Sequence, residues 1–373
     1  MQKITMLEKF SVTNFKNFNE KLTLDFAASD YQFNPQSIKD GIVKTAIVYG
    51  ANASGKSNLG FAILDIVQHL TRWNNSDIHY NHYLNKLNKT PYAEFEYCFK
   101  FGQNKVIYRY SKMDHNTLLD ESLHIDDKEV LSVRRIGVKD VNFSLQGTEN
   151  LNKDIIDSDK LSIIRYVQEN TVLIDSEETQ IFKEFHGFVN KMLFFRSVEE
   201  RSFIGLKNGE YNIFQDIIKK NNVQDFQEFL NEAGIACQLK TANDLFGERL
   251  VFMIGDEEVD FSSIASSGTL ALSLFYFWYQ RIQVNKTSFV FIDEFDAFYH
   301  HNLSKFVVKK LKEIDVQVIF TTHNTDIMSN DLLRPDCYFI LANNQITPIN
   351  KLTDQELRAA HNLQKLYKAH AFE

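Results

Sequence analysis

Cysteine, proline and long apolar runs are all scarce in this 373-residue chain. Its three cysteines stand far apart without a C-x-x-C pair, which argues against a zinc knuckle and predicts a reducing compartment. The longest apolar stretch, residues 270–279, is far shorter than the ~20 residues that span a bilayer. With 14 glycines and four prolines, the chain also lacks the composition of a disordered protein. We therefore expect a folded cytoplasmic protein that does not enter a membrane.

Positive charge is scarce as well. The chain has 41 lysines and arginines against 49 acidic residues, a formal net charge of −8 and a pI near 5.8. General nucleic-acid binding through a strongly basic surface is therefore not supported, although a local basic patch stays compatible with the composition. Apolar residues make up 44% of the chain, which is enough for the core of one large or two ordinary domains.

The most informative segment is residues 50–57, GANASGKS, which match the pattern G-x-x-x-x-G-K-[ST]. Gly50 and Gly55 let the backbone wrap phosphate groups with its N–H groups, and the helix that follows adds its N-terminal dipole. Lys56 places a positive charge on the β- and γ-phosphates, and the Ser57 hydroxyl suits Mg²⁺. An apolar strand pattern precedes the loop and a helical pattern follows it, as the motif requires. The segment predicts a site for ATP and Mg²⁺.

Polar groups also follow two strands late in the chain. Asp293 and Glu294 end the apolar run 288–292, so Asp293 can reach the metal through water while Glu294 orients or deprotonates the attacking water. His323 follows the next strand, where it can donate to the γ-phosphate. Acidic strand ends are common, and a lone histidine is more often structural. The order of these groups behind the glycine loop favours the functional interpretation.

A Ser-Gly helix start precedes the acidic pair. Residues 266–269, SSGT, open a helical pattern, and small hydroxyl residues with a glycine at a helix N-terminus form an anion site. The alternative is a plain N-cap, and the local sequence does not separate the two. The order along the chain (loop, long insertion, Ser-Gly, Asp-Glu, His) favours the anion site at Ser267 and Gly268.

Periodicity divides the chain into three parts. Residues 1–135 form an N-terminal lobe with the glycine loop and an antiparallel β meander, and residues 136–248 form an irregular, mainly helical insert. Residues 249–373 form a C-terminal lobe, where apolar runs between helices predict a parallel, helix-covered sheet. Strands are expected at 7–14, 21–27, 45–49, 92–101, 105–113, 118–125, 287–292, 316–320, 338–341 and 345–349. Helices are expected from residue 56 and at 179–192, 223–233, 268–283, 303–314 and 354–368, and Asn343-Asn344 predicts a hairpin turn.

This order resembles the ABC-type ATPase superfamily, in the branch that contains the Rad50/SMC proteins and the OLD-like (AAA15/AAA21) ATPases. Residues 15–18, FKNF, resemble the start of this group near the bound base. Residues 50–58, GANASGKSN, are close to its nucleotide loop, and residues 292–300, IDEFDAFYH, are similar to its Walker B segment. His300 matches the OLD-like histidine, where SMC proteins carry Asp. The resemblance implies this nucleotide-binding set: Lys16, Asn17, Asn52, Ala53, Ser54, Gly55, Lys56, Ser57, Asn58, Ser267 and Gly268.

The resemblance also implies a fold and an assembly. The fold is an α/β ABC-type ATPase head, with a mixed sheet, flanking helices and an antiparallel meander, and the lack of sustained heptads predicts no long coiled coil. Lys56, Glu294 and His323 are implied as catalytic groups, with Ser57 and Asp293 as metal ligands. In this group the Ser-Gly segment of one subunit caps the nucleotide of the other. A homodimer, or a larger assembly of such dimers, is therefore expected.

Three departures from the family pattern stand out. The signature is reduced to SSGT, which puts the strength of ATP-driven dimerisation in doubt, and His301 replaces the proline of the OLD-like "LHP" element. Only about 50 residues follow His323, so a fused Toprim nuclease domain is not expected. The family's Q-loop glutamine is not placed, because Gln68 lies in the helix after the loop and Gln103 in a turn.

Stand-alone OLD-like ATPases resemble the sensor or regulatory subunits of bacterial anti-phage and abortive-infection systems. The leading hypothesis is therefore an ATPase that controls a nuclease or toxin partner in trans. A Rad50/SMC-like ATPase of DNA repair or chromosome maintenance is the first alternative, against which the missing heptads and His300 count. A transporter nucleotide-binding subunit is the second, against which the long insertion counts. The third is a nucleotide-clamped scaffold that hardly hydrolyses ATP.

Overall fold

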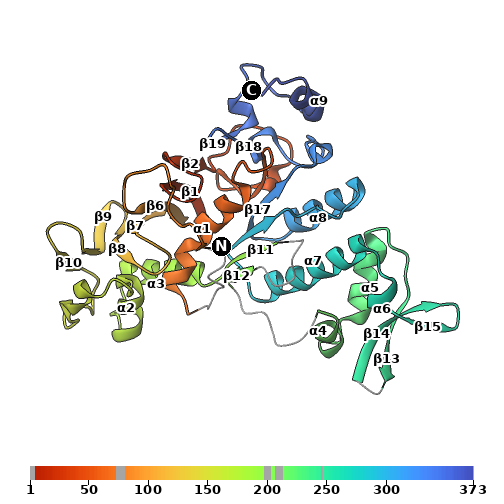
Figure 1. Cartoon of the computed structure of the whole chain (residues 1–373), viewed down its shortest axis with the longest axis horizontal. Helices are drawn as coiled ribbons and strands as arrows, with labels where there is room; N and C mark the ends of the chain where they lie inside the picture. The colour runs from red at the N-terminus through yellow and green to blue at the C-terminus, as the bar shows by residue number, and fades with distance from the viewer. Residues whose placement is uncertain (1–4, 73–79, 197–202, 206–212, 245–246, 373) are drawn as a thin grey trace.

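Two seven-stranded sheets organise the fold (Figure 1). The computed structural model describes residues 5–72, 80–196, 203–205, 213–244 and 247–372. One sheet is antiparallel and the other is mainly parallel, and helix α1 (Lys56–Leu70) contacts both of them. This arrangement confirms the predicted α/β class with a mixed sheet and an antiparallel meander.

The antiparallel sheet confirms the meander expected near the start of the chain and extends it. Its strand order is β10-β9-β8-β7-β6-β1-β2, with every neighbouring pair antiparallel. The strands β9 and β10 were not expected. The bounds are β1 Thr5–Thr13, β2 Leu22–Asp25, β6 Ala93–Phe101, β7 Asn104–Lys112, β8 Leu118–Ile125, β9 Lys128–Arg134 and β10 Asp140–Phe143.

The parallel sheet has the order β12-β11-β16-β17-β5-β18-β19. Its five central strands run parallel, and β12 and β19 close the two edges in the antiparallel direction. Asn343 and Asn344 form the expected hairpin turn between β18 and β19, with φ angles of 50° and 58°. The bounds are β5 Thr45–Tyr49, β11 Met192–Arg196, β12 Phe203–Gly205, β16 Phe289–Asp293, β17 Gln317–Thr322, β18 Tyr338–Ala342 and β19 Gln345–Pro348.

Helix α1 is buried on nearly every face, as a helix between two sheets must be. Towards the parallel sheet, a Cβ at Gly60 would come within 2.6 Å of the Phe291 ring and 2.8 Å of the Phe194 ring, so only glycine fits at this contact. Towards the antiparallel sheet, the Tyr97 hydroxyl donates to the carbonyl oxygen of Ala62 at 2.9 Å. The loop that precedes α1 is thereby held at a fixed place between the sheets.

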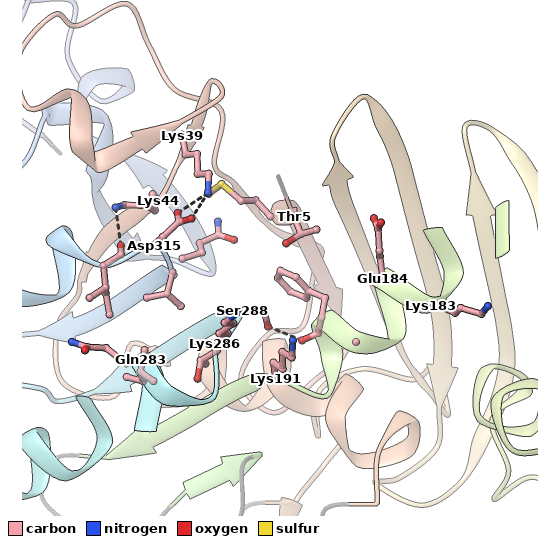
Figure 2. A pocket seen from close by; sticks show the side chains of 18 residues that line it. Thr5, Lys39, Lys44, Lys183, Glu184, Lys191, Gln283, Lys286, Ser288 and Asp315 are labelled. Atoms are coloured by element: carbon pink, nitrogen blue, oxygen red, sulfur yellow. Dashed lines mark hydrogen bonds and ion pairs between the residues drawn. The ribbon is translucent and has the colours of Figure 1, made fainter. Parts of the chain in front are cut away.

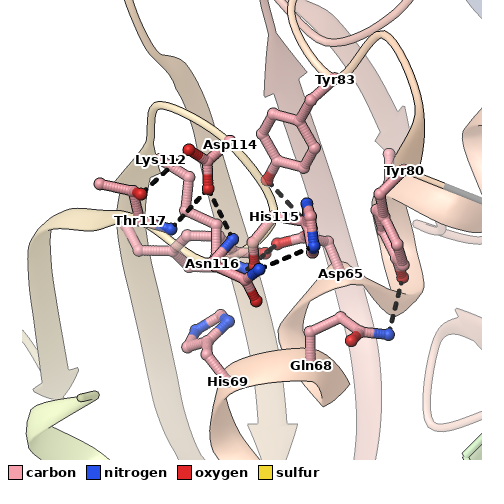
Figure 3. A network of polar contacts seen from close by, with 12 residues as sticks. Asp65, Gln68, His69, Tyr80, Tyr83, Lys112, Asp114, His115, Asn116 and Thr117 are labelled. Atoms are coloured by element: carbon pink, nitrogen blue, oxygen red, sulfur yellow. Dashed lines mark hydrogen bonds and ion pairs between the residues drawn. The ribbon is translucent and has the colours of Figure 1, made fainter. Parts of the chain in front are cut away.

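A buried polar network also fixes α1 against the antiparallel sheet (Figure 3). The Asp65 carboxylate on α1 accepts from the hydroxyls of Tyr83 and Tyr110 at 2.9 Å each and pairs with the Lys112 ammonium at 2.8 Å. Asp65 and Lys112 are both fully buried. Removing either partner would leave an uncompensated buried charge, which costs about 3–5 kcal/mol, so this pair specifies how α1 docks.

A small third sheet lies at the lower right of Figure 1, and several of the remaining helices pack on it. Phe261 anchors this sheet, because its ring packs on Phe252, Phe214 and Phe226. The bounds are α2 Ile163–Asn170, α3 Glu177–Val189, α4 Ile213–Lys219, α5 Val223–Glu232, α6 Phe261–Ile264, α7 Ser267–Val284, α8 His301–Glu313, α9 Leu363–Lys368, β3 Ile38–Lys39, β4 Ile42–Val43, β13 Leu239–Asp244, β14 Gly247–Ile254 and β15 Glu257–Asp260.

Two expected elements differ from the structure. The helix expected at 179–192 ends at Val189, and Met192 begins β11, which pairs in parallel with β16. The segment expected to be a mainly helical insert therefore supplies a central strand of the parallel sheet, while the three-part division itself stays a prediction. The closing helix expected at 354–368 begins only at Leu363, because Asn330 donates to the carbonyl oxygens of Arg358 and His361 and holds that stretch in a turn.

Helix length is limited throughout the described chain. The longest helix there is α7, with 18 residues, and no coiled-coil arm is present among the described residues, as expected. Within these same ranges, none of the helices combines the length and apolar character needed to cross a bilayer.

Candidate nucleotide-binding site

The glycine loop joins the end of β5 to the start of α1 and folds tightly on itself. Gly55 has a φ of 104°, and a Cβ there would meet the side-chain amide of Asn17 at 2.3 Å. At Gly50, a Cβ would meet the Ser54 hydroxyl at 2.5 Å and the carbonyl oxygen of Leu341 at 2.8 Å. Both glycines are therefore required by close approach, and the backbone curls around a point in front of the α1 N-terminus.

Lys56 faces the inside of this loop. Its ammonium group donates to the carbonyl oxygens of Gly50 at 2.9 Å and Ala51 at 3.1 Å, and it lies 2.9 Å from His323 Nε2. Burial lowers the pKa of Lys56, while the nearby Asp293 and Glu294 raise it. Burial and the Lys56 charge lower the pKa of His323. Because an ammonium group can only donate, this contact is a hydrogen bond in which Nε2 of His323 accepts from Lys56.

Asp293 is held rigidly at the end of β16. It is fully buried, and its Oδ1 accepts from the Thr321 hydroxyl at 2.7 Å while its Oδ2 accepts from Arg196 Nε at 3.0 Å. The same Thr321 oxygen accepts the backbone N–H of Glu294 at 2.8 Å. Glu294 has a φ of 49°, a left-handed conformation that turns the chain sharply after the strand. The partly buried Glu294 side chain thus follows directly after an immobilised carboxylate.

The predicted metal ligands fit Mg²⁺ in chemical type. A hydroxyl at Ser57 and a carboxylate at Asp293 are hard oxygen donors, and Mg²⁺ in nucleotide sites takes one or two such groups together with phosphate oxygens and water. No group of three or more histidine, cysteine or acidic side chains arranged for a metal occurs among the residues that the structure describes.

Asn17 connects the turn between β1 and β2 to the loop. Its amide donates to the carbonyl oxygen of Ser54 at 3.2 Å, and its side-chain oxygen accepts from Asn58 at 2.7 Å. Lys16 lies beside it, but its ammonium group donates to the carbonyl oxygen of Asn81 at 2.9 Å. Of the two residues expected near the base, only Asn17 contacts the loop in this structure. Asn52 and Ala53 are exposed at the loop tip.

The Ser-Gly helix start lies apart from these groups. Ser266 caps α7 by accepting the N–H of Thr269 at 3.2 Å, and Ser267 is exposed. A Cβ at Gly268 would stand 3.0 Å from the carbonyl oxygen of Phe298. Among the hydrogen bonds of the described residues, none joins Ser267 or Gly268 to the glycine loop. The structure therefore brings together the loop, Asp293, Glu294 and His323, and leaves the Ser-Gly start facing solvent.

Sequence reasoning missed two residues of this site. Arg196 ends β11 directly opposite Asp293 in the strand register, and Thr321 was read only as part of the segment before His323. A sequence signal for Arg196 was present: a charged residue that directly follows an apolar run, here 192–195, is typical of the end of a buried strand. The glutamine that the sequence left unplaced also stays unassigned, since Gln68 donates to the Tyr80 hydroxyl and Gln103 lies exposed between β6 and β7.

Comparison with known proteins gives one family match. Residues 46–329, which contain the loop, the Ser-Gly start, Asp293 and His323, match the family AAA_21, described as "AAA domain, putative AbiEii toxin, Type IV TA system". No curated protein matches the chain.

Solved structures give distant likenesses only. An SMC head bound to the C-terminal winged-helix domain of ScpA is 16% identical, with a TM-score of 0.44, over 91% of this chain and 96% of that chain. The SMC head domain from Thermotoga maritima is 14% identical, with a TM-score of 0.45, over 92% and 98%. An SMC head with an extended coiled coil, bound to the C-terminal domain of ScpA derived from Pyrococcus furiosus, is 12% identical, with a TM-score of 0.44, over 92% and 96%. Scores of this size carry no functional conclusion.

Proposed function

Because the chain belongs to the AAA_21 family, we propose that it binds ATP with Mg²⁺ at residues 50–58 and hydrolyses it. One observation carries the proposal. The strands β5, β17 and β16 are neighbours in the parallel sheet, and their carboxyl ends bring Lys56, His323 and the Asp293-Glu294 pair to one edge. Ligands of open α/β sheets bind outside this edge, where the strands end.

Each of these groups has a definite task in phosphoryl transfer. Loop N–H groups and Lys56 bind the β- and γ-phosphates, and Ser57 and Asp293 would hold the metal, which would neutralise charge on the transferred group. Glu294 accepts a proton from the attacking water, and His323 donates to the γ-phosphate. In the structure Lys56 and His323 already contact each other, so both donors would reorient together when phosphate oxygens replace the loop carbonyls.

The assembly proposed is a homodimer with two composite sites, or a larger assembly of such dimers. Each site would combine Lys56, Ser57, Asp293, Glu294 and His323 of one chain with Ser267 and Gly268 of the other. The exposed Ser-Gly helix start supports this assignment, because an anion site at a helix N-terminus that faces solvent is open to a second copy.

Two substitutions test the ATPase. Glu294→Gln keeps the side-chain size and removes the base, so we expect ATP binding at wild-type affinity, turnover lowered by about 10²-fold or more, and an ATP-bound dimer in light scattering. Lys56→Ala is expected to lose ATP binding itself. If Glu294→Gln turned over ATP at the wild-type rate, the chain would be a nucleotide-clamped scaffold and the catalytic assignment would be wrong.

For its cellular role, we propose regulation of a nuclease or toxin partner in an anti-phage or abortive-infection system. The family description, which names a toxin of a type IV toxin–antitoxin system, supports this reading. The test is co-purification with the product of the neighbouring gene, followed by a toxicity assay that compares the wild type with Lys56→Ala. Absence of a partner together with an unchanged phenotype would remove the basis of this role. Stimulation of ATP turnover by DNA ends would favour the Rad50/SMC-like alternative instead.

A further inference from the structure

A second cavity lies at the opposite edge of the parallel sheet from the nucleotide loop (Figure 2). Its volume is about 910 Å³, and its wall includes Ser288, just before β16, and Gln317, the first residue of β17. The same two strands end at Asp293 and Thr322 in the candidate ATP site. Five residues of strand rise about 17 Å, so the two sites are well separated.

Residues from both sheets line this cavity. Thr5 and Met6 belong to β1 of the antiparallel sheet, and the Gln317 side chain ties the sheets together at its floor. The Gln317 amide donates to the carbonyl oxygen of Leu7 at 2.8 Å, and its side-chain oxygen accepts the N–H of Leu7 at 2.9 Å. The cavity therefore lies where the two sheets meet, and regular secondary structure forms part of its wall.

The cavity concentrates positive charge in a chain whose net charge is −8. Five lysines line it, and only two carboxylates, Asp315 and Glu184, oppose them. The lysines come from three stretches of the chain, residues 39–44, 183–191 and 286, so no single helix face accounts for them. They are Lys39, Lys44, Lys183, Lys191 and Lys286.

Three of these ammonium groups already have protein partners. Lys39 pairs with Asp315 at 2.6 Å, and Lys183 pairs with Asp175 at 3.2 Å. Lys44 is almost fully buried and donates to the carbonyl oxygens of Lys312 and Ile314 at 2.9 Å each. Burial lowers the pKa of Lys44, and the neighbouring Lys39 and Lys312 also lower it while Asp315 raises it.

The other two ammonium groups are uncommitted. Lys191, between α3 and β11, and Lys286, after α7, are exposed and have no side-chain partner in the part of the chain that the structure describes. Lysine is a compact, strongly hydrated point charge that suits phosphate oxygens. Two unpaired ammonium groups on the wall of one cavity favour an anion with more than one negative charge, and the volume falls within the range of small-molecule sites.

We propose that this cavity binds a ligand that carries several phosphate groups, with Lys191 and Lys286 as its main contacts. Two sources share this chemistry: a free oligophosphate or nucleotide, and the phosphorylated end of a nucleic-acid strand. The site is distinct from the ATP site and does not depend on hydrolysis there. It also accounts for a local basic region in an acidic protein.

Direct binding measurements test this site in the full chain. The Lys56→Ala background keeps the nucleotide loop from taking the probe, and the probes are inorganic tripolyphosphate and a short 5′-phosphorylated oligonucleotide. Lys191→Glu with Lys286→Glu is expected to weaken probe binding about tenfold or more. The matched control is Lys309→Glu with Lys368→Glu, which changes the net charge equally at exposed positions on α8 and α9 outside the cavity, and it should leave binding unchanged within about twofold.

The probes also separate the two sources. Tight binding of tripolyphosphate alone would indicate a free oligophosphate, whereas tighter binding of the oligonucleotide, displaced by tripolyphosphate, would indicate a nucleic-acid end. Circular dichroism and thermal unfolding check the fold, and the neutral pair Lys191→Gln with Lys286→Gln replaces the charge reversal if that pair unfolds. Equal weakening in the cavity and control pairs, or no binding of either probe, would overturn the proposal.

Discussion

Thr321 places a single hydroxyl between two parts of the candidate ATP site, because it donates to Asp293 and accepts from the backbone of Glu294. Thr321→Val keeps the shape but leaves the fully buried Asp293 carboxylate short of one donor. We expect the free energy of unfolding to fall by about 1–3 kcal/mol in urea titrations. ATP turnover should fall with it, since Glu294 loses its backbone anchor.

The conservative variant Thr321→Ser retains the hydroxyl and serves as the control for this prediction. It should restore most of the turnover at a modest cost in stability. Wild-type turnover in Thr321→Val would show that the Asp293-Glu294 turn does not need this anchor.

His69 predicts a pH dependence of stability. It is buried on α1, with Nε2 at 2.8 Å from the Tyr108 hydroxyl, and burial followed by the charge of Lys112 holds its pKa well below the usual 6.5. Below about pH 6.5 His69 binds a proton in the unfolded chain but stays neutral in the folded chain. The free energy of unfolding therefore falls as pH drops. His69→Gln should flatten this slope between pH 7 and 5 by up to about 1.4 kcal/mol per pH unit.

Chemical unfolding at a series of pH values measures that slope. His300→Gln is the matched control, because it makes the same substitution at an exposed position and leaves the core intact. Identical slopes in His69→Gln and the wild type would contradict the assignment.

Among the elements, α1 carries the clearest prediction because Gly60 packs against two phenyl rings of the parallel sheet. Gly60→Ala forces those rings or the helix to move, which costs about 1–3 kcal/mol of stability. Since α1 also forms the end of the nucleotide loop, its displacement should weaken ATP binding in calorimetric titrations.

Gly187 in α3 is the matched control, because a Cβ there meets no atom within 4 Å. Gly187→Ala should stabilise the protein by about 0.5–1 kcal/mol through helix propensity alone. If both substitutions had the same effect, close packing of α1 on the sheet would not be the cause.

Short apolar runs were predictable from sequence where a turn or loop signal bounded them, but not where they continued a helical pattern. β5 was placed with its observed bounds because five apolar or β-branched residues run into a glycine loop. β11 was missed because residues 192–195 continue the apolar pattern of the helix before them, and a run of four or five residues fits either state. The role of Arg196 was not predicted either, because its position beside Asp293 depends on the pairing of β11 with β16, which a single sequence does not reveal.

At the scale of the whole molecule, the proposed composite site makes a complementation prediction. Lys56→Ala removes one half of each site, and Ser267→Arg blocks the other half. Each variant alone should be inactive. When the two are mixed, heterodimers contain one intact site, so about a quarter of the wild-type turnover should return in a phosphate-release assay. Ser267→Arg should still bind ATP as a monomer, and wild-type turnover by this variant alone would contradict a site shared between chains.

The order of the parallel sheet has a consequence for how the protein is made. β5, which leads into the nucleotide loop, lies between β17 and β18, so its two neighbours are synthesised far later than β5 itself. At roughly 5–20 residues per second, β5 waits on the order of 15–60 s on the ribosome before its partners emerge. The antiparallel sheet is complete by residue 143, and its contacts to α1 through Asp65 and Tyr97 are available during that interval. The sheet that supplies none of the predicted catalytic groups can thus pack on the nucleotide loop's helix until the rest of the chain has been translated.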